Sequence, residues 1–208
     1  MQKTKKLDFD KTSLPKKSAC LDASLIEGQL IDCHEAEHAP AILAILNEAI
    51  VNSTALYDYH PRPLVAMSAW FATKRAGHFP VLGWVDPQGE LLGFANYGPF
   101  RAFPAYKYTV EHSVYVRSDC RGQGLGRVLL QALIARAQSE AAGQKVHTLV
   151  GCIDAANLAS IALHTSLGFT HCGTIRQAGF KFDRWLDAAF YQLILPTPSQ
   201  PVADPPTA

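Results

Sequence analysis

Apolar residues recur along this chain with two different periods, which predict alternating helices and strands. A spacing of three and four residues is typical of a helix that covers a core, whereas short β-branched and aromatic runs are typical of strands. The helical pattern covers 40–50, 68–74, 127–141 and 158–167. The strand pattern covers 80–85, 91–97, 108–116, 148–153, 180–182 and 188–195. A leading pair of strands followed by strand–helix units predicts an α/β sandwich with a mixed central sheet flanked by helices.

Turn-forming residues mark several ends of these elements. Asp86-Pro87-Gln88-Gly89 separates the first two predicted strands, which makes them an antiparallel hairpin. Pro40 is expected in the first turn of the first helix, and Gly168 ends the last predicted helix.

The two ends of the chain differ in composition from the body between them. Residues 1–17 carry six lysines and no apolar run of the length that a signal peptide needs. Residues 196–208 contain five prolines among small and polar residues, a composition that does not pack a core. We therefore expect a flexible N-terminal extension over 1–29, one folded domain over 30–195 and a disordered proline-rich tail over 196–208.

Composition and charge narrow the class of protein. The chain has 208 residues, 48% of them hydrophobic, which suits one globular domain. The formal net charge of +1 argues against nucleic acid as a partner, because nonspecific binding to it requires a broad basic surface. No apolar run approaches the ~18–20 residues of a transmembrane helix. The five cysteines are scattered and never spaced C-x-x-C, so we expect no disulfide framework and a reducing, cytoplasmic location.

One motif raises the possibility of a zinc hydrolase. His34, Glu35 and His38 satisfy H-E-x-x-H, which on a helix places two imidazoles on one face to bind zinc. Pro40 follows at once, and its ring would meet the carbonyl of Ala36 inside a helix. We therefore expect the motif to precede the helix. No third ligand stands out downstream, and we predict no metal site.

A glycine-rich loop gives a second candidate site. Arg121-Gly122-Gln123-Gly124-Leu125-Gly126 follows a predicted strand and precedes a helix, so its backbone N–H groups can turn toward one point at the helix N-terminus. Such a loop is suited to bind an anion. It lacks the Lys-Ser/Thr of a P-loop and the G-x-G-x-x-G spacing of dinucleotide-binding folds.

These residues carry a family resemblance. Arg121-x-x-Gly124-x-Gly126 resembles the pyrophosphate loop of the GNAT acyl-CoA N-acetyltransferases, and the later stretch from Asn157 through His164 to Phe169 resembles their second signature. Segments 109–116, 159–164 and 179–187 are similar to the phosphinothricin and methionine sulfoximine N-acetyltransferases. The resemblance covers 31–195 and implies a GNAT-type sandwich with a splayed central sheet.

The resemblance also implies an activity: direct transfer of an acetyl group from acetyl-CoA to the α-amino group of a small amino acid or toxic analogue. Glu111 matches the proposed general base, and His164 occupies the position of a tyrosine that can protonate the departing thiolate. The implied cofactor-binding residues are Val114, Tyr115, Val116, Arg121, Gly122, Gln123, Gly124, Leu125, Gly126, Arg127 and Asn157. The implied substrate-binding residues are Arg101, Phe103, Tyr106 and Glu111.

Some assignments stay open at this point. Phe103 stands where phosphinothricin-specific relatives tend to carry a second basic residue, which weakens the case for strong phosphinothricin activity. Arg184 and Trp185 either complete the acceptor pocket or stabilise the last strands, while His112 is expected to be structural. A homodimer is expected from the family. The alternatives are a non-catalytic acyl-CoA sensor, the zinc hydrolase, and an acetyltransferase for a polyamine or a protein N-terminus.

Overall fold

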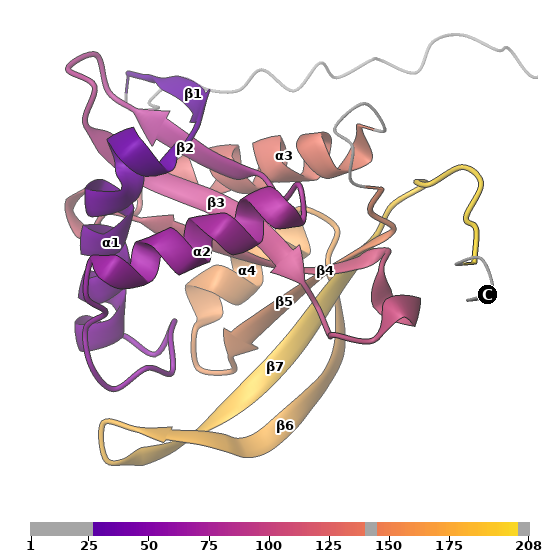
Figure 1. Ribbon diagram of the computed structural model, residues 1–208. Helices are drawn as coiled ribbons and strands as arrows, with labels where there is room; N and C mark the ends of the chain where they lie inside the picture. Colours follow the sequence, from indigo (N-terminus) through magenta and orange to yellow (C-terminus); the bar gives the residue numbers. More distant parts are fainter. Residues whose placement is uncertain (1–26, 140–144, 204–208) are drawn as a thin grey trace, which may run out of the picture.

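A computed structural model describes residues 27–139 and 145–203 (Figure 1). The strands are β1 (Gln29–Asp32), β2 (Val81–Val85), β3 (Leu91–Pro99), β4 (Thr109–Val116), β5 (Thr148–Asp154), β6 (Thr170–Lys181) and β7 (Arg184–Ile194). The helices are α1 (Glu35–Asn52), α2 (Val65–Ala76), α3 (Leu125–Gln138) and α4 (Leu158–Ser166), with two 3₁₀ turns, η1 (Pro104–Tyr106) and η2 (Ser118–Cys120). Within the described residues the strands form one seven-stranded mixed sheet in the order β1-β2-β3-β4-β5-β7-β6. The predicted sandwich with a mixed sheet is confirmed.

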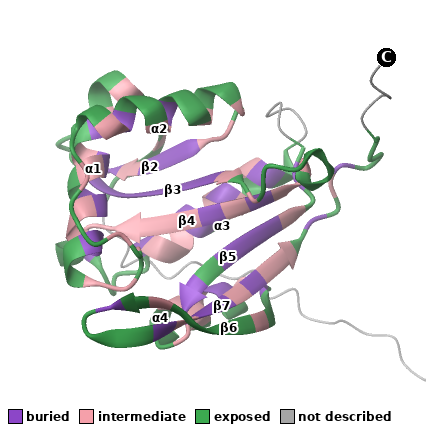
Figure 2. Cartoon of the chain, turned by 60° about the horizontal axis from the view of Figure 1, so that its bottom comes forward, coloured by how far each residue is buried: buried purple, intermediate pink, exposed green. Residues whose placement is uncertain are grey.

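The sheet separates two hydrophobic cores. On one face, α1 and α2 bury side chains such as Ile42, Met67 and Phe71 against Phe94 of β3. On the other face, α3 packs its apolar stripe, including Leu129, against the sheet, and α4 lies on this side too (Figure 1). Figure 2 shows the buried residues concentrated along β2, β3 and β5 between these layers. The pattern is that of a sheet covered by helices on both sides.

Local turn chemistry explains the β2–β3 and β6–β7 hairpins. In the β2–β3 turn, Asp86 Oδ1 accepts hydrogen bonds from the N–H groups of Gln88 and Glu90, and Gly89 takes φ +86°. In the β6–β7 turn, Phe182 and Asp183 both have positive φ, as a tight two-residue hairpin turn requires.

Strand β6 begins earlier than the sequence predicted. The apolar pattern predicted only 180–182, whereas β6 runs over Thr170–Lys181. Its register with β7 shifts at two places, between His171 and Gly173 and between Ile175 and Gly179. Because an irregular, largely exposed strand shows no clean alternation, the pattern fails there.

The start of α1 corrects the prediction for the histidine motif. The helix begins at Glu35, so it contains most of the motif that we expected to precede it, and Pro40 lies inside the helix. Pro40 and Ala36 are both exposed, so water can satisfy the Ala36 carbonyl that loses its helical partner. The predicted clash with the proline ring is accommodated at this exposed place.

The chain ends fall partly outside the described residues. Of the predicted extension over 1–29, residues 1–26 lie outside them, and so do residues 204–208 of the predicted tail. Residues 197 and 202 touch the body, because Thr197 Oγ1 donates to the Val146 carbonyl and the Val202 N–H donates to Tyr108 Oη. The domain limits at 30 and 195 stay a prediction. Within the described ranges, no helix combines the length and apolar character needed to cross a membrane.

Candidate active site

The central strands β4 and β5 separate along their length. They run parallel and pair only over Thr109–Glu111 and Thr148–Val150. Beyond this short ladder, β4 continues to Val116 and stays paired with β3, while β5 continues to Asp154 and stays paired with β7. Facing backbone groups of the two strands are therefore left open to a ligand.

A cavity of about 590 Å³ occupies this opening. Its walls come from the end of α1 and the residues after it, from both separating strands, from the glycine loop and from α4. Eight of the predicted site residues line it: Glu111, Val114, Tyr115, Val116, Arg121, Gly126, Asn157 and His164. The fold thus brings the predicted base and part of the predicted anion loop to one cavity.

Glu111 is the last residue of β4 that pairs with β5, and its side chain lies on the face of the sheet that α1 and α2 cover. Its carboxylate Oε2 is 3.7 Å from Arg101 Nη1. Burial raises the pKa of Glu111, and the neighbouring Arg101 guanidinium partly opposes this rise. A carboxylate whose pKa is raised is a stronger base while it remains ionised at neutral pH.

The glycine loop has the backbone shape that the sequence predicted. Gly122 and Gly124 take φ +76° and +83°, a region in which residues with a Cβ are strained. Gly124 is the N-cap of α3, so the loop leads directly into the free N–H groups of that helix. These groups and the positive end of the helix dipole suit a phosphate or pyrophosphate.

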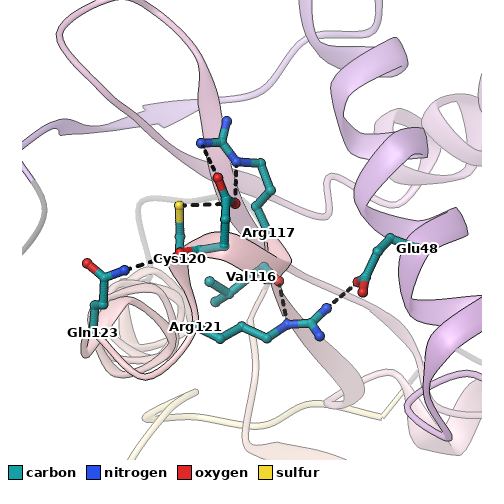
Figure 3. A network of polar contacts seen from close by, with 7 residues as sticks. Glu48, Val116, Arg117, Cys120, Arg121 and Gln123 are labelled. Carbon is teal, nitrogen blue, oxygen red and sulfur yellow. Dashed lines mark hydrogen bonds and ion pairs between the residues drawn. The ribbon is translucent and has the colours of Figure 1, made fainter.

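The Arg121 side chain points away from this anion position. Its Nε donates to the Val116 carbonyl at 3.0 Å, and its Nη2 forms an ion pair with Glu48 of α1 (Figure 3). Arg121 therefore joins the loop to α1 and to the end of β4. The backbone of the loop, more than this guanidinium, is placed to hold an anion.

The remaining loop residues do not line the cavity with their side chains. Gln123 Nε2 donates to the Asp119 carbonyl, Arg127 Nη2 donates to Ser166 Oγ on α4, and Leu125 is buried in the core. Their predicted cofactor contacts depend on the backbone.

His164 is buried at the far wall of the cavity and has a partner at each ring nitrogen. Nδ1 lies 2.7 Å from the Ser160 carbonyl, and Nε2 lies 2.9 Å from Nε2 of His112. Burial lowers the pKa of both histidines, to about 3 for His112, where the neighbouring His164 adds to the effect. Both rings are therefore neutral at physiological pH.

Asn157 has a structural task at the start of α4. Its Oδ1 accepts a hydrogen bond from the Ser160 N–H at 3.1 Å, which makes it the N-cap of the helix. Because the residue also lines the cavity, its amide N–H₂ group remains available to a ligand.

The predicted acceptor loop lies beside the cavity. Phe103 is 72% exposed and Tyr106 is 42% exposed, and neither lines the cavity. Arg101 stacks over Phe100, with 4.1 Å from its guanidinium carbon to the ring centroid, and reaches Glu111. Arg101 is thus the member of this loop that touches the predicted base.

Sequence reasoning missed several residues that line the cavity, among them Thr54, Tyr57, Cys152 and Asp154. The buried Asp154 carboxylate accepts from Thr54 Oγ1 and pairs with Arg184. This contact gives Arg184 a structural partner, whereas Trp185 is 58% exposed. Partial desolvation and the nearby Glu111 carboxylate raise the pKa of the Cys152 thiol to about 11, so it is a poor nucleophile. No motif surrounds these residues, and only the fold reveals them.

The residues after α1 are held to the β6–β7 hairpin by three contacts. The buried Lys181 ammonium donates to the carbonyls of Ile50, Ser53 and Leu56, at 2.6, 2.9 and 2.6 Å. Tyr59 Oη donates to the Phe180 carbonyl. The Tyr57 ring lies over Gly179, where an added Cβ would come within 2.7 Å of it. The hairpin therefore positions one wall of the cavity.

The histidine motif on α1 is engaged in local contacts. Glu35 forms an ion pair with Arg75 at 2.6 Å, and His38 Nδ1 accepts a hydrogen bond from the His34 N–H at 3.0 Å. In the two described stretches, no group of three or more His, Cys, Asp and Glu side chains is arranged to hold a metal ion.

Relatives of known activity resemble most of the chain. It is 50% identical to the L-methionine sulfoximine/L-methionine sulfone acetyltransferase of Pseudomonas aeruginosa over 163 residues, 78% of this chain and 92% of the relative. It is 38% identical to the phosphinothricin N-acetyltransferase of Alcaligenes faecalis over 153 residues, 74% of this chain and 76% of that one.

Solved structures agree with the fold. The crystal structure of a GNAT superfamily phosphinothricin acetyltransferase from Sinorhizobium meliloti, in complex with AcCoA, superposes with a TM-score of 0.78. The two are 30% identical, and the match covers 86% of this chain and 95% of the other. The model of the acetyltransferase (GNAT) family matches residues 42–169, which include the separating strands, the glycine loop and α4. The chain belongs to the GNAT family of acetyltransferases.

Proposed function

We propose that this protein transfers the acetyl group of acetyl-CoA to the α-amino group of an amino acid or an analogue of one. Methionine sulfoximine, methionine sulfone and phosphinothricin are the first acceptors to consider, because relatives carry these activities in their names. The observation that carries the proposal is geometric. The Glu111 carboxylate and the end of the glycine loop line one cavity, formed where β4 and β5 separate.

The residues present fit acetyl-CoA. The open edge of β4 over Val114–Val116 offers backbone groups to the amides of a pantetheine arm, and Gly122 and Gly124 shape a loop that fits a pyrophosphate. Asn157 faces the same cavity. When bound, acetyl-CoA supplies the acetyl group as a reactive thioester.

Glu111 serves as the general base in this proposal. An amino acid arrives as an ammonium and must lose a proton before its nitrogen can attack a carbonyl. Glu111 precedes Val114 by three residues on β4, which is roughly 10 Å along the strand. A carboxylate there accepts the proton, directly or through one water, near the place where the thioester would lie.

The role of His164 in returning a proton to the departing thiolate stays a prediction. Its Nδ1 lies on the Ser160 carbonyl and its Nε2 lies on His112. To act as an acid toward a ligand in the cavity, the ring has to release one of these two partners.

Arg101 is proposed to orient the acceptor. Its guanidinium can bind a carboxylate or an oxidised sulfur or phosphorus group through two parallel hydrogen bonds. Because it lies 3.7 Å from Glu111, an acceptor held by Arg101 places its amine near the base. The exposed Phe103 ring in the same loop favours acceptors with apolar or bulky side chains.

We further propose a cytoplasmic homodimer. The β6–β7 hairpin exposes Ile175, Phe180, Phe182 and Trp185, each at least 45% accessible, and Figure 2 shows β6 largely exposed. Phe180 and Trp185 contact each other, with 5.2 Å between ring centroids, and exposed apolar groups that gather on one element are typical of a contact surface.

The test is release of the CoA thiol from acetyl-CoA with a panel of amines. The panel contains methionine sulfoximine, methionine sulfone, phosphinothricin, the common amino acids and a polyamine. We expect turnover with an amino acid or analogue, and a loss of at least ~100-fold in Glu111→Gln, the lower end for a general base. The matched control is Glu90→Gln, an exposed carboxylate in the β2–β3 turn, which leaves the rate unchanged.

Other outcomes separate the alternatives. Binding of acetyl-CoA without turnover on any amine supports a sensor, and turnover on the polyamine alone replaces the amino-acid acceptor. Full activity in Glu111→Gln removes the base from the mechanism. Stoichiometric zinc and chelator-sensitive hydrolysis would support the hydrolase.

A further inference from the structure

We infer that His112 is a positioning residue that sets the distance of α4 from β4, and with it the width of the cavity that would hold the acyl-pantetheine arm of acetyl-CoA. This inference rests on the proposed function. It starts from the place of His112 in the sheet, directly after the last residue that pairs β4 with β5. That last pair is Glu111 with Val150, and the next residues, His112 and Gly151, belong to the separated part.

The His112 ring lies over Gly151, where β5 has no side chain. A Cβ added to Gly151 would come within 3.0 Å of His112 Cε1 and within 3.4 Å of His164 Cδ2. The missing side chain thus gives the two imidazoles room on this face of the sheet. The ring lies over the point at which β4 and β5 diverge, and there it contacts His164 of α4.

The proton positions in this histidine pair follow from its partners. The Ser160 carbonyl can only accept, so His164 Nδ1 carries a proton and donates to it. The neutral His164 ring then presents a lone pair at Nε2, so the 2.9 Å contact is a hydrogen bond in the tautomer in which His112 Nε2 carries the proton and donates it. In that tautomer the buried His112 Nδ1 is an acceptor without a hydrogen-bond partner among the described residues. The two hydrogen bonds are therefore donated in one direction, from His112 of β4 to His164 of α4 and from His164 to the Ser160 carbonyl.

The pair is fixed by its surroundings. Each histidine is 5% exposed, and Phe169 packs against both rings with centroid distances of 5.0 and 5.1 Å. Because α4 also contributes Ser160 and Leu163 to the cavity wall, its distance from β4 determines how much space a ligand has there. The anion loop is also held to β4 and α1 by Arg121, whose Nε donates to the Val116 carbonyl and whose Nη2 pairs with Glu48.

Because different contacts hold α4 and the anion loop, a change at His112 should affect some ligands more than others. Loss of the His112 hydrogen bond leaves a buried lone pair on His164 and loosens α4 from β4. Ligands that extend into the cavity beside α4 should bind more weakly, while the affinity of ligands that reach only the anion loop should not change. Two probes differ in this way: acetyl-CoA, and 3′-phosphoadenosine 5′-diphosphate, which has the pyrophosphate and lacks the pantetheine arm.

The experiment measures the Kd of both probes by calorimetry for the wild type and three variants. We expect His112→Leu to raise the Kd of acetyl-CoA about tenfold, equivalent to one lost buried hydrogen bond, with little change for the nucleotide. His112→Gln retains an amide N–H donor and should restore most of the affinity. Gly151→Ala, which forces the ring to move, should resemble His112→Leu.

A matched control separates this role from stability alone. Leu130→Ala removes a fully buried side chain of α3 in the same core and should lower stability without changing the ratio of the two Kd values. An unchanged ratio in folded His112→Leu, or an equal loss for both probes, overturns the inference. Failure of the wild type to bind acetyl-CoA instead overturns the proposed function.

Discussion

At the scale of single residues, the contact between Glu111 and Arg101 leads to a prediction about how activity depends on pH. Burial raises the pKa of the carboxyl, and the guanidinium at 3.7 Å lowers it. In the proposed mechanism the deprotonated carboxylate is the base, so activity should increase with pH as Glu111 ionises. The acid side of the rate profile therefore reports the pKa of this residue.

Arg101→Gln tests this assignment. Without the positive charge, nothing opposes the effect of burial on Glu111, so the pKa of its carboxyl rises. The acid limb of the kcat/KM profile then moves to higher pH. The measurement is the pH profile of kcat/KM with one acceptor from the panel. Arg75→Gln, which removes an ion pair with Glu35 outside the cavity, should leave the limb in place. An acid limb that does not move in Arg101→Gln would mean that another group controls the rate.

Sequence reasoning found Glu111, His164 and the glycine loop as candidates, because a family pattern marks them, and the fold places Glu111, His164 and part of the loop at one cavity. Sequence reasoning could not find the residues that these site residues contact. The sequence predicts a structural role for His112 but not its partner, because no local pattern indicates that Nε2 of His164, 52 positions away, lies 2.9 Å from Nε2 of His112.

At the scale of elements, the Lys181 contact joins two segments that are far apart in the sequence. The ammonium takes the place of water for three carbonyls near the C-terminus of α1, where the helix dipole is negative. The sequence around Lys181 predicts a short strand and carries part of the family similarity, but it does not predict the contact with α1. The start of α1 and the first half of β6 were also misjudged, because proline at an exposed helical position and bulges in an exposed strand weaken the usual rules.

Lys181→Met should destabilise the protein. The change keeps an apolar chain of similar length and leaves buried carbonyls without a donor, which costs about 2–4 kcal/mol in the free energy of unfolding. Urea denaturation gives the measurement, with the exposed Lys145→Met as control, for which we expect a change within about 0.5 kcal/mol. Equal midpoints for the two variants would show that the contact contributes no stability.

At the scale of the whole molecule, the β6–β7 hairpin leaves large apolar side chains exposed to water, which favours a partner that covers them. Phe180 and Trp185 stack edge to face, with 5.2 Å between ring centroids, and form a preorganised patch. The same hairpin carries the Lys181 contact to the cavity wall. A second copy that covers the patch would therefore also support the site.

Sedimentation analysis should give twice the chain mass of 22.7 kDa. The double variant Ile175→Ser with Trp185→Ser should shift this species to the monomer, because it removes apolar area from the contact. The control is Val65→Ser, which alters a residue that is 78% exposed on α2. A monomeric wild type at micromolar concentration contradicts the dimer.

The short pairing of β4 with β5 has one more consequence. A sheet ordinarily has unpaired edges only at its margins, where they can recruit strands from other molecules. This sheet has two additional edges in its middle, beyond Glu111 and Val150. Both lie within a cavity that α4 and the residues after α1 enclose on either side. The opening that admits a ligand is thus shielded from intermolecular strand pairing, and the fold keeps an interior edge without offering a template for aggregation.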